Sequence, residues 1–131
     1  MDELYRDYIL DHYKNPRNFG ELEPHDLEFH DHNPLCGDEL GVHLVVDDEG
    51  RIADLRFHGQ GCAISQAAAS ISSEELIGKP VAEIPSLGAD WMLDQLGIPV
   101  SPTRRKCALL SLKVMRGAAG GEATWPEAGS E

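Results

Sequence analysis

At 131 residues, the chain has the length of a single domain with a hydrophobic core of its own. Its formal net charge of −12 leaves no broad basic surface, which argues against general affinity for nucleic acid. The sequence has no apolar run of the roughly 20 residues that a membrane span needs, and its charged N-terminus is unlike a signal peptide. We therefore expect a cytoplasmic protein with no membrane partner.

The predicted elements begin with one helix, and a group of strands follows it. Apolar residues recur at helical spacing over residues 2–14, and Pro16 ends the pattern. Strand-like alternation or apolar runs then occupy residues 24–32, 41–46 and 51–58. Because Asp-Asp-Glu-Gly at 47–50 is typical of a hairpin turn, these segments predict a three-stranded antiparallel sheet.

From Cys62 onward the pattern is helical. The segment up to Ile77 is rich in small side chains, which allow close packing on a sheet, and Gly78 is a typical residue for the end of a helix. Further helical segments are predicted at residues 80–84, 88–96 and 103–116.

Strands followed by helices predict an α+β fold, in which a three-stranded antiparallel sheet packs against several helices in one compact domain. We assign residues 1–116 to this domain. The remaining residues, 117–131, are rich in Gly, Ala and Glu, and we expect them to form a flexible C-terminal tail.

Three cysteines are an odd number, so a complete disulfide framework within the chain is excluded. Cys36 lies in a turn that contains Pro and Gly, whereas Cys62 and Cys107 each open a predicted helix. None of them lies in the middle of an apolar stripe, where an inert buried cysteine is expected. The N-terminus of a helix favours the thiolate, which is both the nucleophilic and the metal-binding form of cysteine.

A shared metal site is one interpretation of these cysteines. Asp38, two residues after Cys36, is a candidate fourth ligand, and a Cys₃Asp set fits tetrahedral zinc or iron in a small cluster. The absence of a CxxC pair argues against a zinc finger and a thioredoxin-type redox pair. The long spacings alone favour three unrelated side chains, so the hypothesis of a shared site rests on their loop and helix-start contexts.

Two further groups of residues can be interpreted either as ordinary structural positions or as functional residues. Arg104, Arg105 and Lys106 form a positive cluster, which alone indicates a solvated turn but directly before Cys107 would lower the pKa of the thiol. The histidines follow no metal-ligand spacing, and we interpret them as surface or strand positions. They are His12, His25, His30, His32, His43 and His58.

Four ordered segments that contain all three cysteines resemble the signatures of one known family. They are YRDYILDHYKNPRNFG, NPLCGDE, GQGCAISQAAAS and RRKCALLSLK, and the resemblance runs from about residue 3 to about residue 116. On these motifs the chain resembles the iron–sulfur cluster assembly scaffolds, the IscU, SufU and NifU N-terminal group. The resemblance implies a compact α+β fold with a metal or cluster site at one exposed end.

The resemblance also implies ligands and partners. By motif match, Cys36, Asp38, Cys62 and Cys107 would bind zinc in the protein as purified, and iron or a [2Fe–2S] cluster transiently. Sulfur would come as a persulfide from a cysteine desulfurase, a pyridoxal-phosphate enzyme, with Cys36 or Cys107 as the acceptor. Apo iron–sulfur proteins or carrier proteins would receive the product.

The resemblance points to two branches of the family. IscU-like members have His before the last cysteine and an LPPVK motif, where this chain has Lys106 and SPTRR. The Arg104-x-Lys106-Cys107 sequence resembles the SufU branch, but the spacing of 45 residues after Cys62 is IscU-like. We expect a non-catalytic scaffold. The alternatives are a zinc-dependent sulfurtransferase that activates the desulfurase and a purely structural zinc protein.

Overall fold

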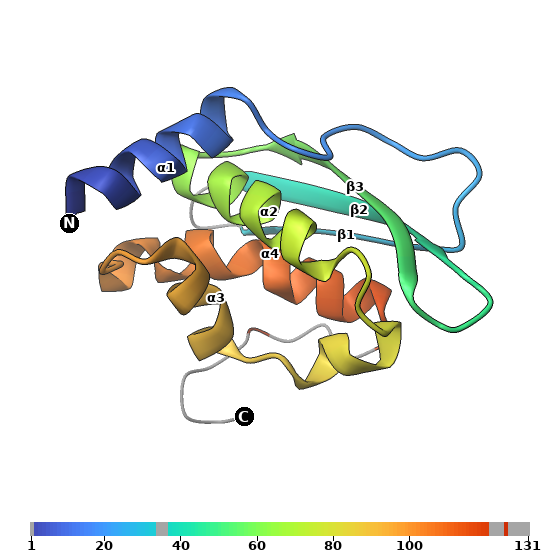
Figure 1. Ribbon diagram of the computed structural model, residues 1–131. Helices are drawn as coiled ribbons and strands as arrows, with labels where there is room; N and C mark the ends of the chain where they lie inside the picture. Colours follow the sequence, from blue (N-terminus) through green and yellow to red (C-terminus); the bar gives the residue numbers. More distant parts are fainter. Residues whose placement is uncertain (1, 34–36, 121–124, 126–131) are drawn as a thin grey trace.

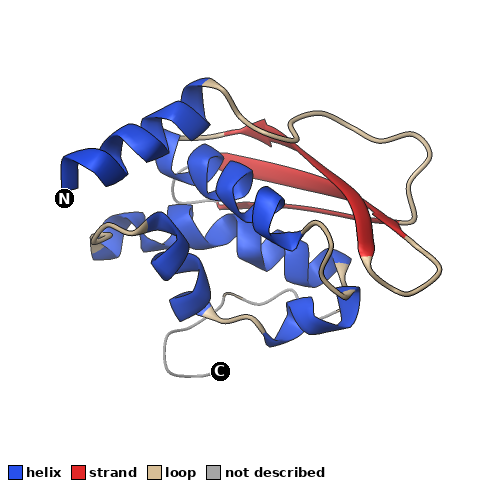
Figure 2. Ribbon diagram, viewed as in Figure 1, coloured by secondary structure: helices blue, strands red, loops and turns tan. Residues whose placement is uncertain are grey.

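The computed structural model describes residues 2–33, 37–120 and 125. These residues form a three-stranded sheet that is covered by helices on one face (Figures 1 and 2). The strands are β1 (Leu27–Asn33), β2 (Asp38–Val46) and β3 (Ile52–Gln60). The α-helices are α1 (Asp2–Lys14), α2 (Ala63–Leu76), α3 (Ala89–Leu96) and α4 (Arg105–Ala118), and the short 3₁₀ helices are η1 (Val81–Ser86) and η2 (Pro102–Arg104). No helix in the described part of the chain is long and apolar enough to cross a membrane.

The predicted antiparallel sheet is confirmed, with the strand order β1-β2-β3. Strand β2 starts at Asp38, three residues before the predicted start, because Asp38 already pairs with Asn33 at the end of β1. The predicted last helix is divided at its start, where Pro102 opens a short 3₁₀ turn, and α4 continues to Ala118. The expected flexible tail falls mostly on residues outside those described.

Alternation along β2 separates the two faces of the sheet. Leu40, Val42 and Leu44 point to the helices and are at most 1% exposed, whereas the side chains between them point to the outer face. Helix α2 packs on β3, and α4 packs on β1 and β2, while α3 lies against α2 and α4. The core therefore lies between the sheet and the α2–α4 pair.

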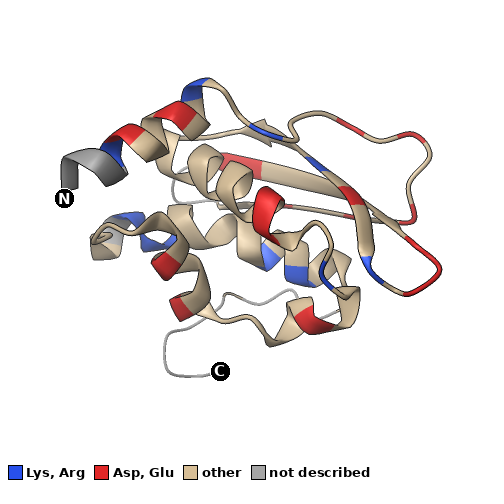
Figure 3. Cartoon of the chain, viewed as in Figure 1, with Lys and Arg blue, Asp and Glu red and all other residues tan. Residues whose placement is uncertain are grey.

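Charge is distributed unevenly over this fold. Acidic residues occur on α1, in the loop before β1 and at the β2–β3 turn, and Lys and Arg, which also occur on α1, on β3 and further along α4, form a group at the start of α4 (Figure 3). The positive cluster at residues 104–106 therefore lies beside one end of the sheet, within an otherwise acidic molecule.

Helix α1 is attached to α2 through a buried histidine. His12 is 1% exposed, and its Nδ1 lies 2.7 Å from Ser70 Oγ, which accepts the Arg17 amide at 2.9 Å. A neutral ring with its proton on Nε2, 3.7 Å from Glu74 Oε1, accepts the Ser70 hydroxyl proton at Nδ1. Burial lowers the pKa of His12, so the folded state favours the neutral ring.

This arrangement predicts a pH-dependent stability. Since the pKa of His12 is lower in the folded state than its ordinary value of 6.5, the unfolded chain binds more protons near that pH. The contribution of the neutral His12 to the free energy of unfolding is complete above about pH 7.5 and is lost as the pH falls towards the lowered pKa. Urea unfolding at several pH values should give a smaller acid-side loss of stability for His12→Gln than for the wild type. Equal pH slopes for the two proteins would contradict this assignment.

Candidate metal centre

Two strand ends and two helix starts meet at one end of the sheet (Figure 1). Asp38 is the first residue of β2, and its neighbour Glu39 pairs with Gln60, the last residue of β3. Cys62 is the N-cap residue of α2, and Cys107 is the third residue of α4. Antiparallel pairing thus places the start of β2 beside the turn that leads into α2.

Three side chains at this end lie close enough to share one ion. A carboxylate oxygen of Asp38 and the Sγ atoms of Cys62 and Cys107 all lie within 4.8 Å of one another. Asp38 and Cys107 are 2% and 1% exposed, whereas Cys62 is half-buried and is accessible from a pocket of about 600 Å³. The pocket is lined by Gly37, Asp38, Gln60, Gly61, Cys62, Arg104 and Cys107.

The hydrogen bonding of the Asp38 carboxylate indicates whether a metal ion would fit this site. Its Oδ1 accepts the backbone N–H of Cys62 at 3.1 Å. Its Oδ2 is buried and has no hydrogen-bond partner within the described part of the chain. A buried carboxylate oxygen without a partner is unfavourable, and a cation held also by two thiolates would satisfy it. The donor set of two sulfurs and one oxygen therefore fits zinc or iron.

Gly61 gives the carboxylate the space it occupies. A Cβ atom at this position would lie 2.7 Å from Asp38 Oδ1 and would also overlap Ser65 Oγ, which donates a hydrogen bond to the Cys62 carbonyl at 3.0 Å. Any larger residue would push the carboxylate away from the Cys62 amide. We missed this role in the sequence, although Gly61 in GQGC was its signal.

The other predicted site residues are placed differently. Arg104 lines the pocket, at the position before α4. Lys106 is exposed, and its Nζ lies over the Trp125 ring at 5.2 Å from the centroid, so it is not among the residues that line the pocket. Cys36 lies outside the described residues.

Comparisons with known proteins identify a family and a fold for the chain. The model of the NifU-like N-terminal domain family matches residues 4–121. The zinc-dependent sulfurtransferase SufU of Bacillus subtilis is 35% identical, with 88% of each chain covered. An iron–sulfur cluster assembly scaffold protein IscU of Archaeoglobus fulgidus is 33% identical, over 86% of this chain and 72% of its own. A crystal structure from Fervidobacterium islandicum, of a proposed SUF-system scaffold, aligns with a TM-score of 0.76 and 29% identity, over 86% of this chain and 94% of its own.

The site predicts a specific effect of Gly61→Ala. The added methyl group should displace the Asp38 carboxylate, and zinc affinity should fall roughly 10- to 100-fold, as it does when a supporting contact of a metal ligand is lost. Competition with a chromophoric chelator measures the affinity, and circular dichroism checks the fold. Ser65→Ala is the control, because it keeps the carboxylate in place and should bind nearly as the wild type does. A folded Gly61→Ala protein with unchanged affinity would overturn the assignment.

Proposed function

The chain belongs to the NifU-like N-terminal domain family, and we propose that it is an iron–sulfur cluster assembly scaffold. One observation is the main support: Asp38, Cys62 and Cys107 present a carboxylate and two thiols within 4.8 Å of one another, beside an open pocket. Thiolates are the usual ligands of iron–sulfur clusters. Here iron and sulfur are the cargo, which enters and leaves through the pocket.

We assign the fourth ligand to Cys36. This residue is two positions before Asp38, and two residues of chain span at most about 7 Å. Asp38 itself is fixed in the sheet by its pairing with Asn33. The short separation in sequence between Cys36 and Asp38 supports a Cys₃Asp ligand set.

We propose Cys36 as the first acceptor of sulfur from a cysteine desulfurase. Its thiolate would attack the outer sulfur of the partner's persulfide, so that a new S–S bond forms while the partner's S–S bond breaks and its cysteine leaves as a thiolate. Cys107, the other candidate, is 1% exposed, which makes it a poor target for a sulfur delivered by a large partner. Reduction of the transferred sulfur to sulfide takes two electrons, which an external reductant must supply.

Asp38 would help the protein to release the cluster as well as to bind it. A carboxylate is a harder and more readily exchanged ligand for iron than a thiolate, and the amide of Cys62 holds only one of its two oxygens. A scaffold must pass its cluster to apo iron–sulfur proteins or carrier proteins, so one exchangeable ligand suits this function. Because the cysteines must stay reduced to bind metal and to accept sulfur, we propose that the protein is in the cytoplasm, where thiols stay reduced.

A zinc-dependent sulfurtransferase is the second candidate function. It is supported by the 35% identity with SufU of Bacillus subtilis and by Arg104 at the pocket. Zinc would hold Cys36 as a thiolate until the desulfurase engages it. The positive charge of Arg104 would then stabilise the anionic sulfur that the chain accepts. In this function, sulfur is relayed and the desulfurase is activated without cluster assembly.

For the scaffold, we predict that Asp38→Ala holds a cluster longer. Anaerobic incubation with ferrous iron, cysteine, a reductant and a desulfurase should give a visible chromophore, and transfer to an apo-ferredoxin should be slower from Asp38→Ala than from the wild type. Glu39→Ala is the control, since Glu39 is next in β2 but is not among the residues that line the pocket. A cluster lost faster from Asp38→Ala would contradict the release role, and zinc retained without a chromophore would exclude the scaffold.

For the sulfurtransferase, we predict that the protein stimulates desulfurase turnover and that Arg104→Gln lowers this stimulation about tenfold, the effect of one hydrogen bond to a charged group. Arg105→Gln is the matched control, because Arg105 is adjacent but is not among the residues that line the pocket. Alanine release measured with and without the zinc-loaded protein provides the rate. The hypothesis fails if the wild type gives no stimulation or if both variants behave alike.

A further inference from the structure

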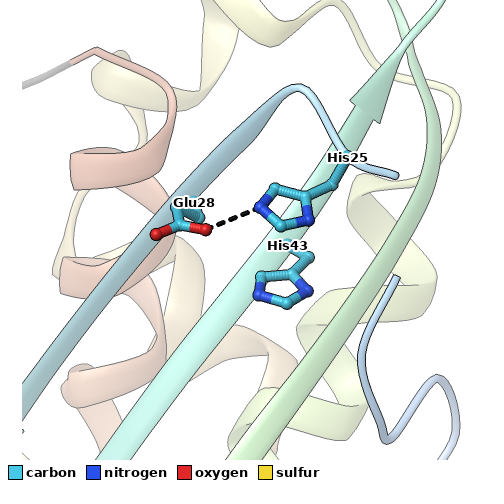
Figure 4. Close-up of side chains that lie close together, drawn as sticks. All are labelled: His25, Glu28 and His43. Atoms are coloured by element: carbon cyan, nitrogen blue, oxygen red, sulfur yellow. Dashed lines mark hydrogen bonds and ion pairs between the residues drawn. The ribbon is translucent and has the colours of Figure 1, made fainter. Parts of the chain in front are cut away.

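A second group of metal-binding side chains lies on the outer face of the sheet. His25 comes from the loop before β1, Glu28 from β1 and His43 from β2, and one ligand atom of each lies within 4.8 Å of the others. Figure 4 shows the two rings stacked, with the Glu28 carboxylate beside the edge of His25. Glu28 and His43 are direct cross-strand partners, so the sheet register fixes two of the three positions.

The backbone of Leu22 orients both rings. Its carbonyl lies 2.7 Å from His25 Nδ1 and only accepts, so Nδ1 bears the proton. His25 Nε2 then faces Glu28 Oε1 at 2.6 Å. The protonated ring satisfies both acceptors, because an imidazolium donates from both nitrogens, and these two hydrogen bonds raise the pKa of His25. A metal ion at this position would take the place of the Nε2 proton. A histidine whose other nitrogen donates to a backbone carbonyl is the usual arrangement of a metal ligand.

His43 is the third candidate ligand; because a metal ion lies in the plane of a ligating imidazole, its ring would have to turn out of the stack with His25 to share an ion with it. His43 is 9% exposed, and its ring lies parallel to that of His25, with 3.9 Å between the centroids and 13° between the planes. Its Nδ1 accepts the Leu22 N–H at 3.1 Å, so the neutral ring has its proton on Nε2. Metal binding at Nε2 would move that proton to Nδ1 and release the Leu22 amide. The loss of this hydrogen bond costs only about 1 kcal/mol.

We propose that His25, Glu28 and His43 form a second divalent-metal site, with two imidazoles and one carboxylate as ligands. This donor set suits Zn²⁺, Fe²⁺, Co²⁺ or Ni²⁺ and leaves positions for water. Glu28 has a side chain that is 67% exposed, so its carboxylate can move from the present 2.6 Å to the roughly 3 Å that separates two ligands of one ion.

Neighbouring residues hold the site in place and leave room beside it. His58 Nδ1 lies 3.3 Å from the Gly20 carbonyl, and its ring lies over Gly41, where a Cβ would be 2.6 Å from Nε2. The ring packs edge-on against His43, with 5.1 Å between the centroids. A small pocket of about 90 Å³ adjoins Glu28 and His43. The loop before β1 is thereby fixed on the sheet, and water can reach the ligands.

This site is separate from the cysteine site. His43 is five residues beyond Asp38 on β2, or about 17 Å at roughly 3.4 Å per residue. The two side chains also point to opposite faces of the sheet, because their positions differ by an odd number. The ligands differ as well: thiolates dominate one site, and imidazoles dominate the other. The second site therefore stands independently of the proposed function.

Cobalt(II) binding to the full chain tests the proposal. Under anaerobic conditions, equilibrium dialysis with metal analysis should give one more equivalent for the wild type than for His25→Ala or Glu28→Gln. The cysteine site is followed separately by its sulfur-to-cobalt charge-transfer absorption, which should be the same in all three proteins. His30→Ala is the matched control, because His30 is also on β1, faces the same side and is exposed. It should keep the additional equivalent.

Hydrogen exchange at the Leu22 amide adds a second readout. Cobalt should accelerate this exchange in the wild type, because the bond to His43 Nδ1 is released, and should leave it unchanged in Glu28→Gln. The proposal is overturned if the wild type binds no equivalent beyond the cysteine site, or if His25→Ala and Glu28→Gln both keep it. If the wild type shows no sulfur-to-cobalt charge-transfer absorption, that result counts against the cysteine site and leaves the second site unaffected.

Discussion

The hydrogen bond from the Cys62 amide to the Asp38 carboxylate joins the sheet to the helical layer at the point where the candidate metal centre lies. It fixes the first residue of β2 to the N-cap of α2, although 24 positions separate them in the chain. One carboxylate oxygen is used in this bond, and the other is buried without a hydrogen-bond partner in the described part of the chain. Two thiols lie close to this carboxylate. The absence of a side chain at Gly61 makes the bond possible, so the site depends on one glycine as much as on its ligands.

Cys107 reaches the same point because α4 is fixed along its whole length. Leu110, Val114 and Ala118 belong to the core beneath the sheet, and Lys113 Nζ forms an ion pair with Asp31 Oδ2 on β1 at 2.7 Å. Burial of this apolar face sets the rotation of the helix, and Cys107 in its first turn then faces the pocket. The positions of the thiols are thus a consequence of core packing, and binding of a metal would find them already assembled.

The sequence allowed a good prediction of the elements, for reasons that are local, whereas the meeting of Asp38, Cys62 and Cys107 followed from their loop and helix-start contexts and from the ordered motifs. Alternation over 51–58 and helical spacing over 103–116 report directly on buried faces. The orphaned oxygen of Asp38 and the direction of Lys106 towards Trp125 were not predictable, since both depend on contacts between distant segments. The histidine cluster was missed for the same reason. Strand register and a loop bring its members together, and no regular spacing in the sequence indicates this.

The outer face of the sheet explains why such a cluster can exist. A three-stranded sheet with helices on one face exposes its other face to water, and apolar side chains there would favour aggregation. This chain instead places histidines on that face and covers them with the loop before β1, which is tied down through the Gly20 and Leu22 backbone. A sheet face that only had to be compatible with water would not need the His25 and His43 rings to stack. Nor would it need His43 to be only 9% exposed or the Glu28 carboxylate to lie 2.6 Å from a ring nitrogen of His25. The loop and the strands hold these groups together, with one potential ligand atom of each within 4.8 Å of the others.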